Sequence, residues 1–489
     1  MGGINIQKIK NYINGKWFDP ECTGYIDVTN PSTGENVGKV PLSVSSEISR
    51  AVEAAQVAYR SWSSTPVSKR TSYLYKLRTL MDENSDKLVR TICIESGKTL
   101  VDALAELKRA IQNVEVACGM PILMQGEKLE GIAAEIDGEV IRQSIGVFAI
   151  IPPFNFPAMV PFWFLPYAIA SGNTVVIKPS EQVPLTMQAV FGLIEQLDLP
   201  DGVVNMVNGD KSASEDLISH PLVRGISFVG SSRVARIVAE ICSKKGKRYQ
   251  ALGSAKNYLL VMEDARIDKV VDALLTSCYG CAGQRCMAAS VIAAVPEVYE
   301  ELKVRFIEAA SKLKVGSALD KNVDVGPVIS AAAKNRIFGL VEKSVEEGAN
   351  LVLDGRQVDL PDELKKGYYI GPTLFTEVTP EMIIAQEEIF GPVAAMMKIE
   401  SLDEGLELIK KSKYGNGASI FTQNGYYARK FEMQANAGMI GINIGVPAPV
   451  AYFPFGGVKE SIYGDIKAQG KDVVNFYTER KIVTLRFFK

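Results

Sequence analysis

The sequence is nearly devoid of histidine: among its 489 residues only His220 is present. A metal site built from several histidines is therefore excluded, and any Ser–His or Cys–His pair would depend on this one side chain. His220 stands directly before Pro221 and ahead of an apolar stretch, which is typical of a structural histidine at a turn. We predict no metal site and no nucleophile assisted by histidine.

The sequence also lacks a charge excess and a long apolar run. Lys and Arg number 54 and Asp and Glu 56, so the formal charge of −2 offers no basic surface to nucleic acid or to an anionic membrane. The longest apolar stretch, 158–170, is shorter than the roughly 20 residues of a membrane span. We interpret it as a buried helix. The polar start of the chain does not suit a signal peptide, so neither a membrane nor a secretory route is expected.

Cysteine is present in an odd number, with seven residues in a long chain. A reduced, cytoplasmic setting is therefore expected rather than a disulfide framework. Cys278 and Cys281 form a C-x-x-C pair, but no second pair or histidine partner accompanies them. We reject a zinc site there.

Short apolar runs alternate with amphipathic stretches from about residue 146 onward. Such runs are typical of strands buried on both faces of a parallel sheet, and their alternation with helices predicts right-handed βαβ units. The first series has predicted strands at 147–151, 174–177, 203–207 and 226–229 and predicted helices at 158–170, 185–197 and 234–242. The second has predicted strands at 259–262, 291–295, 393–399, 418–421 and 439–444 and predicted helices at 270–279, 301–313 and 402–411. Two open α/β sheets are therefore expected.

Two further segments, 139–144 and 482–487, alternate like strands but fit neither series. The second lies at the C-terminus, where a strand often pairs with another subunit, although it could equally close a local sheet. The first 120 residues are expected to be mainly helical after Ser45.

One cysteine has the surroundings of a nucleophile. Cys286 follows the small residues of the segment 280–283 and directly follows Arg285. A neighbouring guanidinium favours thiolate over thiol, which nucleophilic catalysis requires. A single cysteine is more often a buried small hydrophobe, so the pattern alone leaves both interpretations open.

Polar residues follow several of the predicted strands. Asn155 comes after strand 147–151, and Ser231 comes after strand 226–229 at the start of a helix. Ligands of open α/β sheets bind at the carboxyl ends of strands. There an asparagine amide suits a developing oxyanion, and a helix N-terminus suits a pyrophosphate. A turn asparagine and a solvated loop are the ordinary alternatives, and no G-x-G-x-x-G fingerprint is present.

Two more segments carry acidic residues. Lys178 and Glu181 follow strand 174–177, where a carboxylate suits ribose hydroxyls. Glu388 and Phe390 precede strand 393–399. Each segment alone is a weak signal, because a solvated loop or a surface turn has the same composition.

In this order and spacing, the motifs resemble the aldehyde dehydrogenase superfamily over nearly the whole chain. The likeness extends from NYINGKW at 11–17 through NPSTG at 30–34 to PFGGVK at 454–459. It implies an α/β aldehyde dehydrogenase-like fold, with two open parallel-sheet α/β domains and a small β oligomerisation element. The implied division assigns 1–124 and 146–256 to an NAD-binding domain, 257–445 to a catalytic domain, and 125–145 and 465–489 to the oligomerisation element. It also implies a homodimer or homotetramer.

The resemblance assigns roles to individual residues. Cys286 matches the catalytic thiol, which attacks the aldehyde and becomes a thioester after hydride transfer. Asn155 and the backbone N–H of Cys286 match the oxyanion hole. Cofactor contacts are matched by Pro152, Phe154, Lys178, Glu181, Gln182, Ser231, Gly253, Glu388 and Phe390. Because the carboxylate of Glu181 would repel a 2′-phosphate, NAD is favoured as cofactor, with NADP remaining possible.

One departure bears on the reaction. Hydrolytic members carry a glutamate where this chain has Ala251, and alanine cannot activate water. The same loss marks the methylmalonate-semialdehyde dehydrogenase branch, which transfers the acyl group to coenzyme A and which this chain resembles at 153–161 and 283–288. The branch implies that Arg109 and Arg285 bind a substrate carboxylate.

The expected reaction is NAD-dependent oxidation of malonate or methylmalonate semialdehyde to acetyl-CoA or propanoyl-CoA and CO2. Ser254 and Tyr258 stand where the branch usually has Gly and His. A hydrolytic NAD(P)-dependent aldehyde dehydrogenase that releases the free acid is therefore the alternative. A non-catalytic protein on the same fold is a further alternative, against which the presence of Cys286, Asn155 and Glu388 argues.

Overall fold

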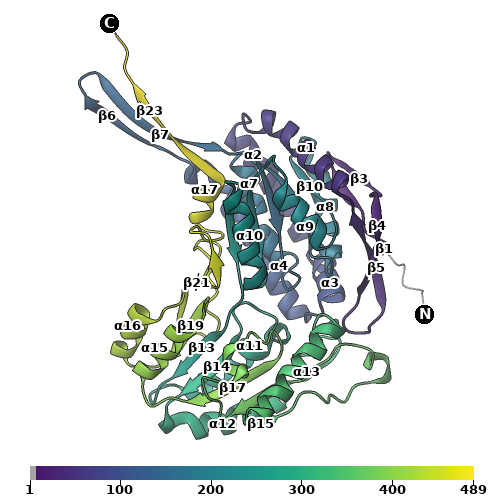
Figure 1. Ribbon diagram of the computed structural model, residues 1–489, viewed down its shortest axis with the longest axis vertical. Helices are drawn as coiled ribbons and strands as arrows, with labels where there is room; N and C mark the ends of the chain where they lie inside the picture. Colours follow the sequence, from purple (N-terminus) through teal and green to yellow (C-terminus); the bar gives the residue numbers. More distant parts are fainter. Residues whose placement is uncertain (1–6, 489) are drawn as a thin grey trace.

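The computed structural model describes residues 7–488, which form two α/β lobes and a projecting β arm (Figure 1). One lobe is built on an eight-stranded sheet, the other on a seven-stranded sheet, and the arm on three strands. The C-terminus lies at the tip of the arm (Figure 1).

The first lobe is centred on five parallel strands buried along almost their whole length. The strand order is β22-β12-β11-β8-β9-β10-β2-β3. The bounds are β2 Asn11–Ile13, β3 Lys16–Phe18, β8 Val147–Ile151, β9 Thr174–Ile177, β10 Val204–Met206, β11 Val223–Val229, β12 Arg248–Leu252 and β22 Ile462–Tyr463. Strands β8 to β12 pair in parallel, whereas β2, β3 and β22 add antiparallel edges.

Helices cover both faces of this sheet. One face packs against α1 (Ser45–Trp62), α9 (Lys211–Ser219) and α10 (Ser232–Lys244). The other packs against α2 (Val67–Glu83), α3 (Ser85–Ser96), α4 (Leu100–Cys118), α5 (Met120–Leu123), α8 (Pro184–Ile194) and α17 (Asp472–Tyr477). The short 3-10 turn η1 (Glu195–Leu197) extends α8.

The second lobe repeats the plan with the strand order β15-β16-β17-β14-β13-β19-β20. Its strands are β13 Asn257–Val261, β14 Ala289–Ala294, β15 Asn350–Leu353, β16 Thr373–Thr376, β17 Val393–Lys398, β19 Gly417–Phe421 and β20 Met439–Ile442. Its helices are α11 Ile267–Tyr279, α12 Pro296–Ser311, α13 Ala331–Glu346, α14 Ile383–Gln386, α15 Leu402–Lys411 and α16 Gly425–Gln434. Only β15 is antiparallel to its neighbour, so the expected fold class is confirmed, with antiparallel strands at the edges that the sequence did not predict.

The prediction of one continuous helix over 158–170 is wrong. The chain forms two short helices, α6 (Met159–Phe162) and α7 (Leu165–Ala170). Pro166 has no N–H to donate to the carbonyl of Phe162, so the helix breaks before it. Both pieces are buried, as expected of this stretch.

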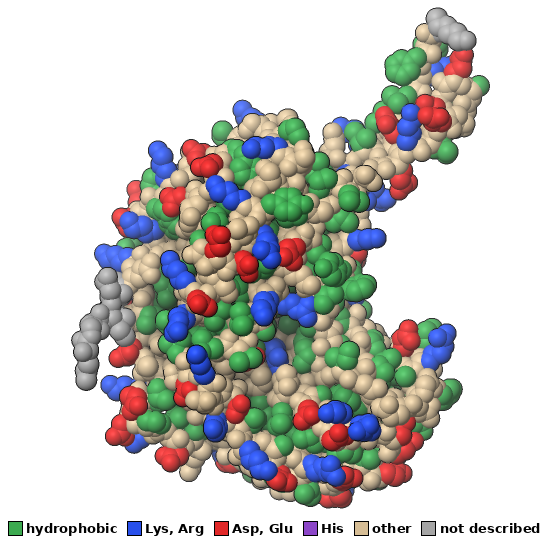
Figure 2. Space-filling view, turned by 180° about the vertical axis from the view of Figure 1, so that it is seen from behind, with side chains coloured by type: hydrophobic (Ala, Val, Ile, Leu, Met, Phe, Trp, Pro, Cys, Tyr) green, Lys and Arg blue, Asp and Glu red, His purple; other side chains and the backbone are tan. Residues whose placement is uncertain are grey.

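The arm consists of β6 (Glu127–Ala133), β7 (Ile136–Ser144) and β23 (Thr478–Leu485) in the order β23-β7-β6. The two segments predicted as strands outside the sheets pair here, with Ile482 opposite Val140. Apolar side chains of the arm stay exposed, among them Leu129 at 66% and Ile482 at 78%. Figure 2 shows the arm standing clear of the two lobes.

The remaining strands form small sheets. They are β1 Gln7–Lys8, β4 Cys22–Thr29 and β5 Asn36–Ser43 in one, and β18 Tyr414–Gly415 and β21 Val458–Lys459 in another. Across the described chain, no helix has the length and apolar character needed to cross a membrane.

A buried polar chain ties the C-terminal helix α17 to the first lobe. The hydroxyl of Tyr477 shares a hydrogen bond of 2.7 Å with Ser227 of β11, which also accepts one of 2.9 Å from Gln250 of β12. All three residues are fully buried. Because water cannot replace the phenol there, this contact stabilises the junction between the arm and the lobe.

We predict that Tyr477→Phe lowers the free energy of unfolding by about 1–2 kcal/mol, because Ser227 loses one of its two hydrogen-bond partners in a dry environment. Urea unfolding followed by fluorescence measures the change. Tyr426→Phe is the matched control, since Tyr426 is 67% exposed, and it should stay within about 0.5 kcal/mol of wild type. Equal stabilities of the two variants would contradict the role of Tyr477.

Candidate active site

The loop before Cys286 has an unusual backbone. Cys281, Ala282 and Gly283 are all left-handed, with φ of 52°, 51° and 68°. Glycine is required at the third position, because a Cβ on Gly283 would lie 1.9 Å from the carbonyl oxygen of Gly391. Asp102 of α4 accepts the N–H of Cys281 at 2.8 Å. The turn is thus held between the second lobe and a helix of the first.

Two asparagines hold the peptide that follows the thiol. The carbonyl of Cys286 accepts hydrogen bonds from Nδ2 of Asn257 at 3.0 Å and from Nδ2 of Asn416 at 2.9 Å. Asn257 begins β13, and Asn416 precedes β19. Together with the bond from Asp102, these contacts fix the backbone on both sides of Cys286.

Asn155 lies beside this loop, as its predicted role requires. It follows β8, is buried, and donates from Nδ2 to the carbonyl of Gln284 at 3.0 Å. An amide nitrogen has two hydrogens, so one remains for a ligand next to Cys286. The structure therefore brings together the two residues predicted to be catalytic.

The surroundings of Cys286 favour the thiol over the thiolate. Burial raises its pKa to about 12 and the charge of Glu388 adds to the rise, while Arg285 and Lys98 oppose it. The effect predicted for Arg285 is thus present but smaller than that of burial. The guanidinium donates to the carbonyl of Thr276, and its Nε is buried without a partner among residues 7–488.

A buried ion pair near the thiol was not found from the sequence. Lys98 pairs with Glu106 of α4, and the two side chains are 3% and 0% exposed. Glu106 also accepts the N–H groups of Ala158 and Met159 at 2.8 and 3.1 Å, at the start of α6. The sequence did hold a sign of this pair, because Glu106 lies next to Leu107 on the buried side of α4, where an unpaired charge would be costly.

A pocket opens above Cys286 on the side of α4 and α6. Cys286, Arg109 and Arg285 line it, so the structure places both predicted carboxylate-binding residues around one hollow. Aromatic walls are provided by Phe156, Trp163 and Phe455. Nη1 of Arg109 donates to the side chain of Gln112 at 3.0 Å.

One wall of this pocket is held by a residue that sequence analysis missed. Gln469 is buried, and its Nε2 donates to the carbonyl of Phe453 at 3.1 Å. Its Oε1 accepts from Asn113 at 3.3 Å, which in turn accepts the hydroxyl of Tyr167 at 3.0 Å. No local pattern marks Gln469, because its partners are distant in sequence.

The predicted cofactor residues meet at one edge of the eight-stranded sheet. Pro152 and Phe154 follow β8, Lys178 follows β9, Ser231 follows β11, and Gly253 follows β12. Parallel strands bring their carboxyl ends to a common edge, so these positions lie along one edge of the sheet. Ser231 caps α10 by accepting the N–H of Val234 at 3.4 Å. A Cβ on Gly253 would lie 2.6 Å from Oγ of Ser232, so this position is closely packed.

Lys178 is fixed before any ligand arrives. Its Nζ donates to the carbonyl of Gly209 at 2.8 Å and pairs with Glu181 at 3.3 Å. Burial lowers the pKa of Lys178, and the charge of Glu181 opposes this. Gln182 follows in the same loop, where its N–H donates to Ser180 at 3.3 Å.

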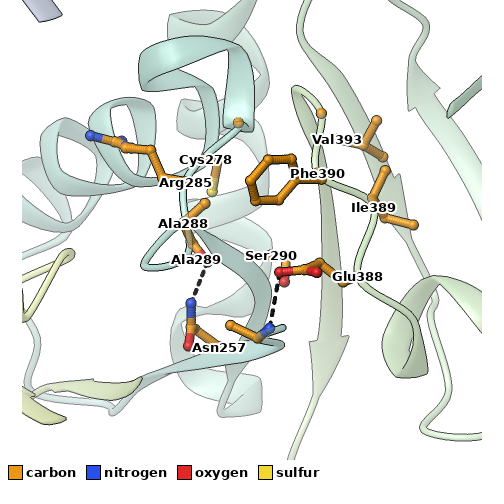
Figure 3. A pocket seen from close by; sticks show the side chains of 13 residues that line it. Asn257, Cys278, Arg285, Ala288, Ala289, Ser290, Glu388, Ile389, Phe390 and Val393 are labelled. Atoms are coloured by element: carbon orange, nitrogen blue, oxygen red, sulfur yellow. Dashed lines mark hydrogen bonds between the residues drawn. The ribbon is translucent and has the colours of Figure 1, made fainter. Parts of the chain in front are cut away.

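Glu388 and Phe390 approach from the second lobe (Figure 3). Glu388 accepts the N–H of Ala255 at 2.9 Å, and burial raises the pKa of its carboxyl group. Burial also lowers the pKa of Lys256 to about 7, and within the described chain its Nζ has no hydrogen-bond partner. The rings of Phe390 and Phe154 pack edge to face, with their centroids 5.7 Å apart. The cofactor-binding residues predicted on the two lobes therefore lie side by side.

The site and fold have counterparts among known proteins. The family model described as the aldehyde dehydrogenase family matches residues 17–483. The chain belongs to the aldehyde dehydrogenase family. A malonate-semialdehyde dehydrogenase of Halalkalibacterium halodurans is 45% identical over 481 residues, which cover 98% of this chain and 99% of that protein.

Solved structures of the family superpose closely. The methylmalonate-semialdehyde dehydrogenase of Oceanimonas doudoroffii is 42% identical, with a TM-score of 0.97 and 99% of each chain covered. A Sinorhizobium meliloti protein assigned to the same activity, solved with NAD, is 38% identical, with a TM-score of 0.97 and 99% of each chain covered.

In this aldehyde dehydrogenase, strand β12 directs no acid toward the thiol. Ala251 packs in the core beneath α1, α9 and α10, whereas Leu252 belongs to the core that contains Cys281 and Met287. Neither side chain offers a proton acceptor.

The raised pKa of Cys286 predicts how fast iodoacetamide alkylates it in the ligand-free enzyme. Because the thiolate fraction grows tenfold per pH unit below the pKa, the rate should rise about tenfold per unit from pH 7 to pH 10 without a plateau. Mass spectrometry of the peptide that carries Cys286 measures it, with the peptide of Cys22, a half-buried residue at the start of β4, followed in parallel. A plateau between pH 6 and 8 would contradict this prediction.

Proposed function

We propose that this protein oxidises malonate or methylmalonate semialdehyde with NAD and transfers the acyl group to coenzyme A. The products are acetyl-CoA or propanoyl-CoA and CO2. The observation that carries the proposal is the composition of the Cys286 pocket. Two arginines line it, and the carboxylates around the thiol are all engaged in other contacts.

The thiol of Cys286 first loses its proton to solvent, and the first bond then forms between its sulfur and the aldehyde carbon. The oxygen of the adduct takes the electron pair of the broken C=O π bond, and the free N–H of Asn155 with the backbone N–H of Cys286 stabilises it. Departure of a hydride from the same carbon, with re-formation of the C=O bond, leaves a thioester on Cys286. The bond between the substrate carboxylate and the α-carbon then breaks with release of CO2, and the α-carbon takes up a proton, so that the acyl group on the sulfur becomes acetyl or propanoyl. The adduct is held in a largely apolar pocket, where such hydrogen bonds are strong.

NAD suits the residues at the rim of the cleft. When bound, NAD supplies the acceptor for the hydride. Lys178 and Glu181 would hold the adenosine ribose, Ser231 the pyrophosphate, and Glu388 with Phe390 the nicotinamide side. The unpaired ammonium of Lys256 next to Glu388 supports a polar ligand there. The carboxylate of Glu181 favours NAD over NADP, and the Sinorhizobium meliloti relative solved with NAD supports this choice.

The carboxylates around Cys286 argue for a thiol acceptor rather than water. Asp102 accepts the N–H of Cys281, Glu106 pairs with Lys98, and Glu388 accepts the N–H of Ala255. A carboxylate held in this way is a poor base for a water molecule. Coenzyme A brings its own thiol, whose thiolate attacks the thioester carbon and releases the sulfur of Cys286.

The domain division follows from the same proposal. Residues 1–124 and 146–256 would bind NAD, 257–445 would carry catalysis, and 125–145 with 465–489 would join subunits of a homodimer or homotetramer. The exposed apolar side chains of the arm support a contact with a second copy. All seven cysteines are free, which supports the cytoplasmic location that we propose.

Coenzyme A should be required for steady turnover. NADH formation from malonate semialdehyde, methylmalonate semialdehyde and propanal is followed with and without coenzyme A, and the products are separated by chromatography. Because no base activates water, the turnover rate without coenzyme A should be lower by a factor of about 100 or more. Equal rates with release of the free acid would establish the hydrolytic alternative and refute the acyl transfer.

Arg109→Gln should weaken recognition of the substrate carboxylate. The kcat/KM for malonate semialdehyde is expected to fall roughly 10- to 100-fold, because the variant loses a charge-assisted hydrogen bond to the substrate carboxylate. The kcat/KM for propanal, which has no carboxylate, should be unchanged. Lys108→Gln removes the same charge from the exposed side of α4 and is the control. Equal losses for both aldehydes would show that Arg109 acts on the fold instead.

A further inference from the structure

The guanidinium of Arg109 is held by a single contact. Its Nη1 donates to Oε1 of Gln112 at 3.0 Å, and within the described chain it makes no other hydrogen bond and no ion pair within 4.0 Å. Two carboxylates line the same pocket, but Asp102 accepts a backbone N–H and Glu106 pairs with Lys98. The positive charge of Arg109 therefore remains available to a ligand in the pocket.

The acceptor that holds Arg109 is itself fixed on its other side. Oε1 of Gln112 also accepts the backbone N–H of Ala451 at 3.4 Å, and Ala451 is buried. An amide oxygen has two lone pairs, so Arg109 and Ala451 together use both of them. Since Arg109 and Gln112 are three residues apart on α4, they lie on one face of the helix. The contact thus joins this face of α4 to the main chain at Ala451.

Ala451 belongs to a segment that is fastened to α4 a second time. We call residues 446–455 the pocket loop, because five of them line the pocket above the thiol. Nε2 of Gln469 donates to the carbonyl of Phe453 in this loop at 3.1 Å, and its Oε1 accepts from Asn113 at 3.3 Å. Asn113 directly follows Gln112 in α4. The partner of Gln112 is therefore held in place, so the amide oxygen has a defined position.

The chemistry of an amide suits this position better than that of an acid. A carboxylate at residue 112 would also accept from Arg109, but it would form an ion pair and neutralise the guanidinium. The neutral oxygen of Gln112 orients the fork and leaves its charge intact. With Nη1 engaged, Nε and Nη2 of Arg109 point together toward another acceptor, which is the arrangement that binds a carboxylate through two parallel hydrogen bonds.

We propose that Gln112 is a positioning residue that makes the enzyme selective for aldehydes carrying a carboxylate. It acts through Arg109, whose guanidinium it holds in the orientation that receives the substrate carboxylate. This inference rests on the proposed function, in which the substrate is a dicarboxylate semialdehyde. Without Gln112 the long side chain of Arg109 would occupy several rotamers, and substrate binding would have to restrict them at a cost in free energy.

The test is a double-mutant cycle on the full-length enzyme, with NAD and coenzyme A saturating. Gln112→Met removes the acceptor at nearly constant side-chain length. It should raise KM for malonate semialdehyde about tenfold with little change in kcat, because the cost of ordering Arg109 is added to binding. The kcat/KM for propanal should stay within about twofold of wild type, since propanal has no carboxylate to meet Arg109.

The second side of the cycle shows whether Gln112 acts through Arg109. In the Arg109→Gln background, Gln112→Met should cause no further loss with malonate semialdehyde, because the group that it orients is gone. Gln56→Met is the matched control. Gln56 is a half-buried residue of α1, which covers the other face of the eight-stranded sheet, and its variant should match wild type with both aldehydes.

Gln112→Glu keeps the test decisive if methionine disturbs the packing of α4. Glutamate preserves the oxygen that accepts from Arg109 and Ala451, but its charge competes with the substrate carboxylate. The kcat/KM for malonate semialdehyde should therefore fall about 100-fold, and that for propanal should be retained.

Equal losses for the two aldehydes in both Gln112 variants, or an undiminished effect of Gln112→Met in the Arg109→Gln background, would overturn this inference. Turnover of wild type without coenzyme A would refute the proposed acyl transfer, whereas the cycle would still report on Gln112. A wild-type enzyme that shows no preference for malonate semialdehyde over propanal would overturn both.

Discussion

The site depends on hydrogen bonds that hold the peptide groups on both sides of Cys286, and these bonds come from two lobes. Asp102 and Asn155 belong to the first lobe, whereas Asn257 and Asn416 belong to the second. The position of the sulfur is therefore set by how the lobes meet. A small rotation between them would change several of these distances together, so the interface between the lobes is part of the site.

Burial raises the pKa of the Cys286 thiol, and it also makes any uncompensated charge near the thiol costly. Charged groups that remain inside must be compensated, as Lys98 and Glu106 are by each other. Lys256 is the exception, since its ammonium has only the nearby charges of Glu388 and Glu387 to offset burial. Among the buried polar atoms without a partner in the described chain, Nζ of Lys256 and Nε of Arg285 lie where we propose that ligands bind.

Much of the architecture could be predicted from local pattern. Strands 147–151 and 174–177 and helix 402–411 have the predicted bounds, because buried parallel strands and an amphipathic helix have periods visible in a short window. The helix over 158–170 failed at Pro166, and the antiparallel edge strands β2, β3, β15 and β22 were missed because they are only two to four residues long, too short to show a period. In the site, the positions of Cys286 and Asn155 followed from motif order. Gln469 and the Lys98–Glu106 pair could not be predicted, since only tertiary contacts give them meaning, and the catalytic roles stay predictions.

The pairing of β23 with β7 has a consequence for biosynthesis. Arg142 and Thr478 are hydrogen-bonded although 336 positions separate them in sequence. Nearly the entire polypeptide must therefore be synthesised before β23 can pair with β7, the middle strand of the arm. Until then β7 has an unpaired edge, ready to accept any extended segment. A chain interrupted near its end is thus left with an unpaired strand edge on β7, which favours aggregation.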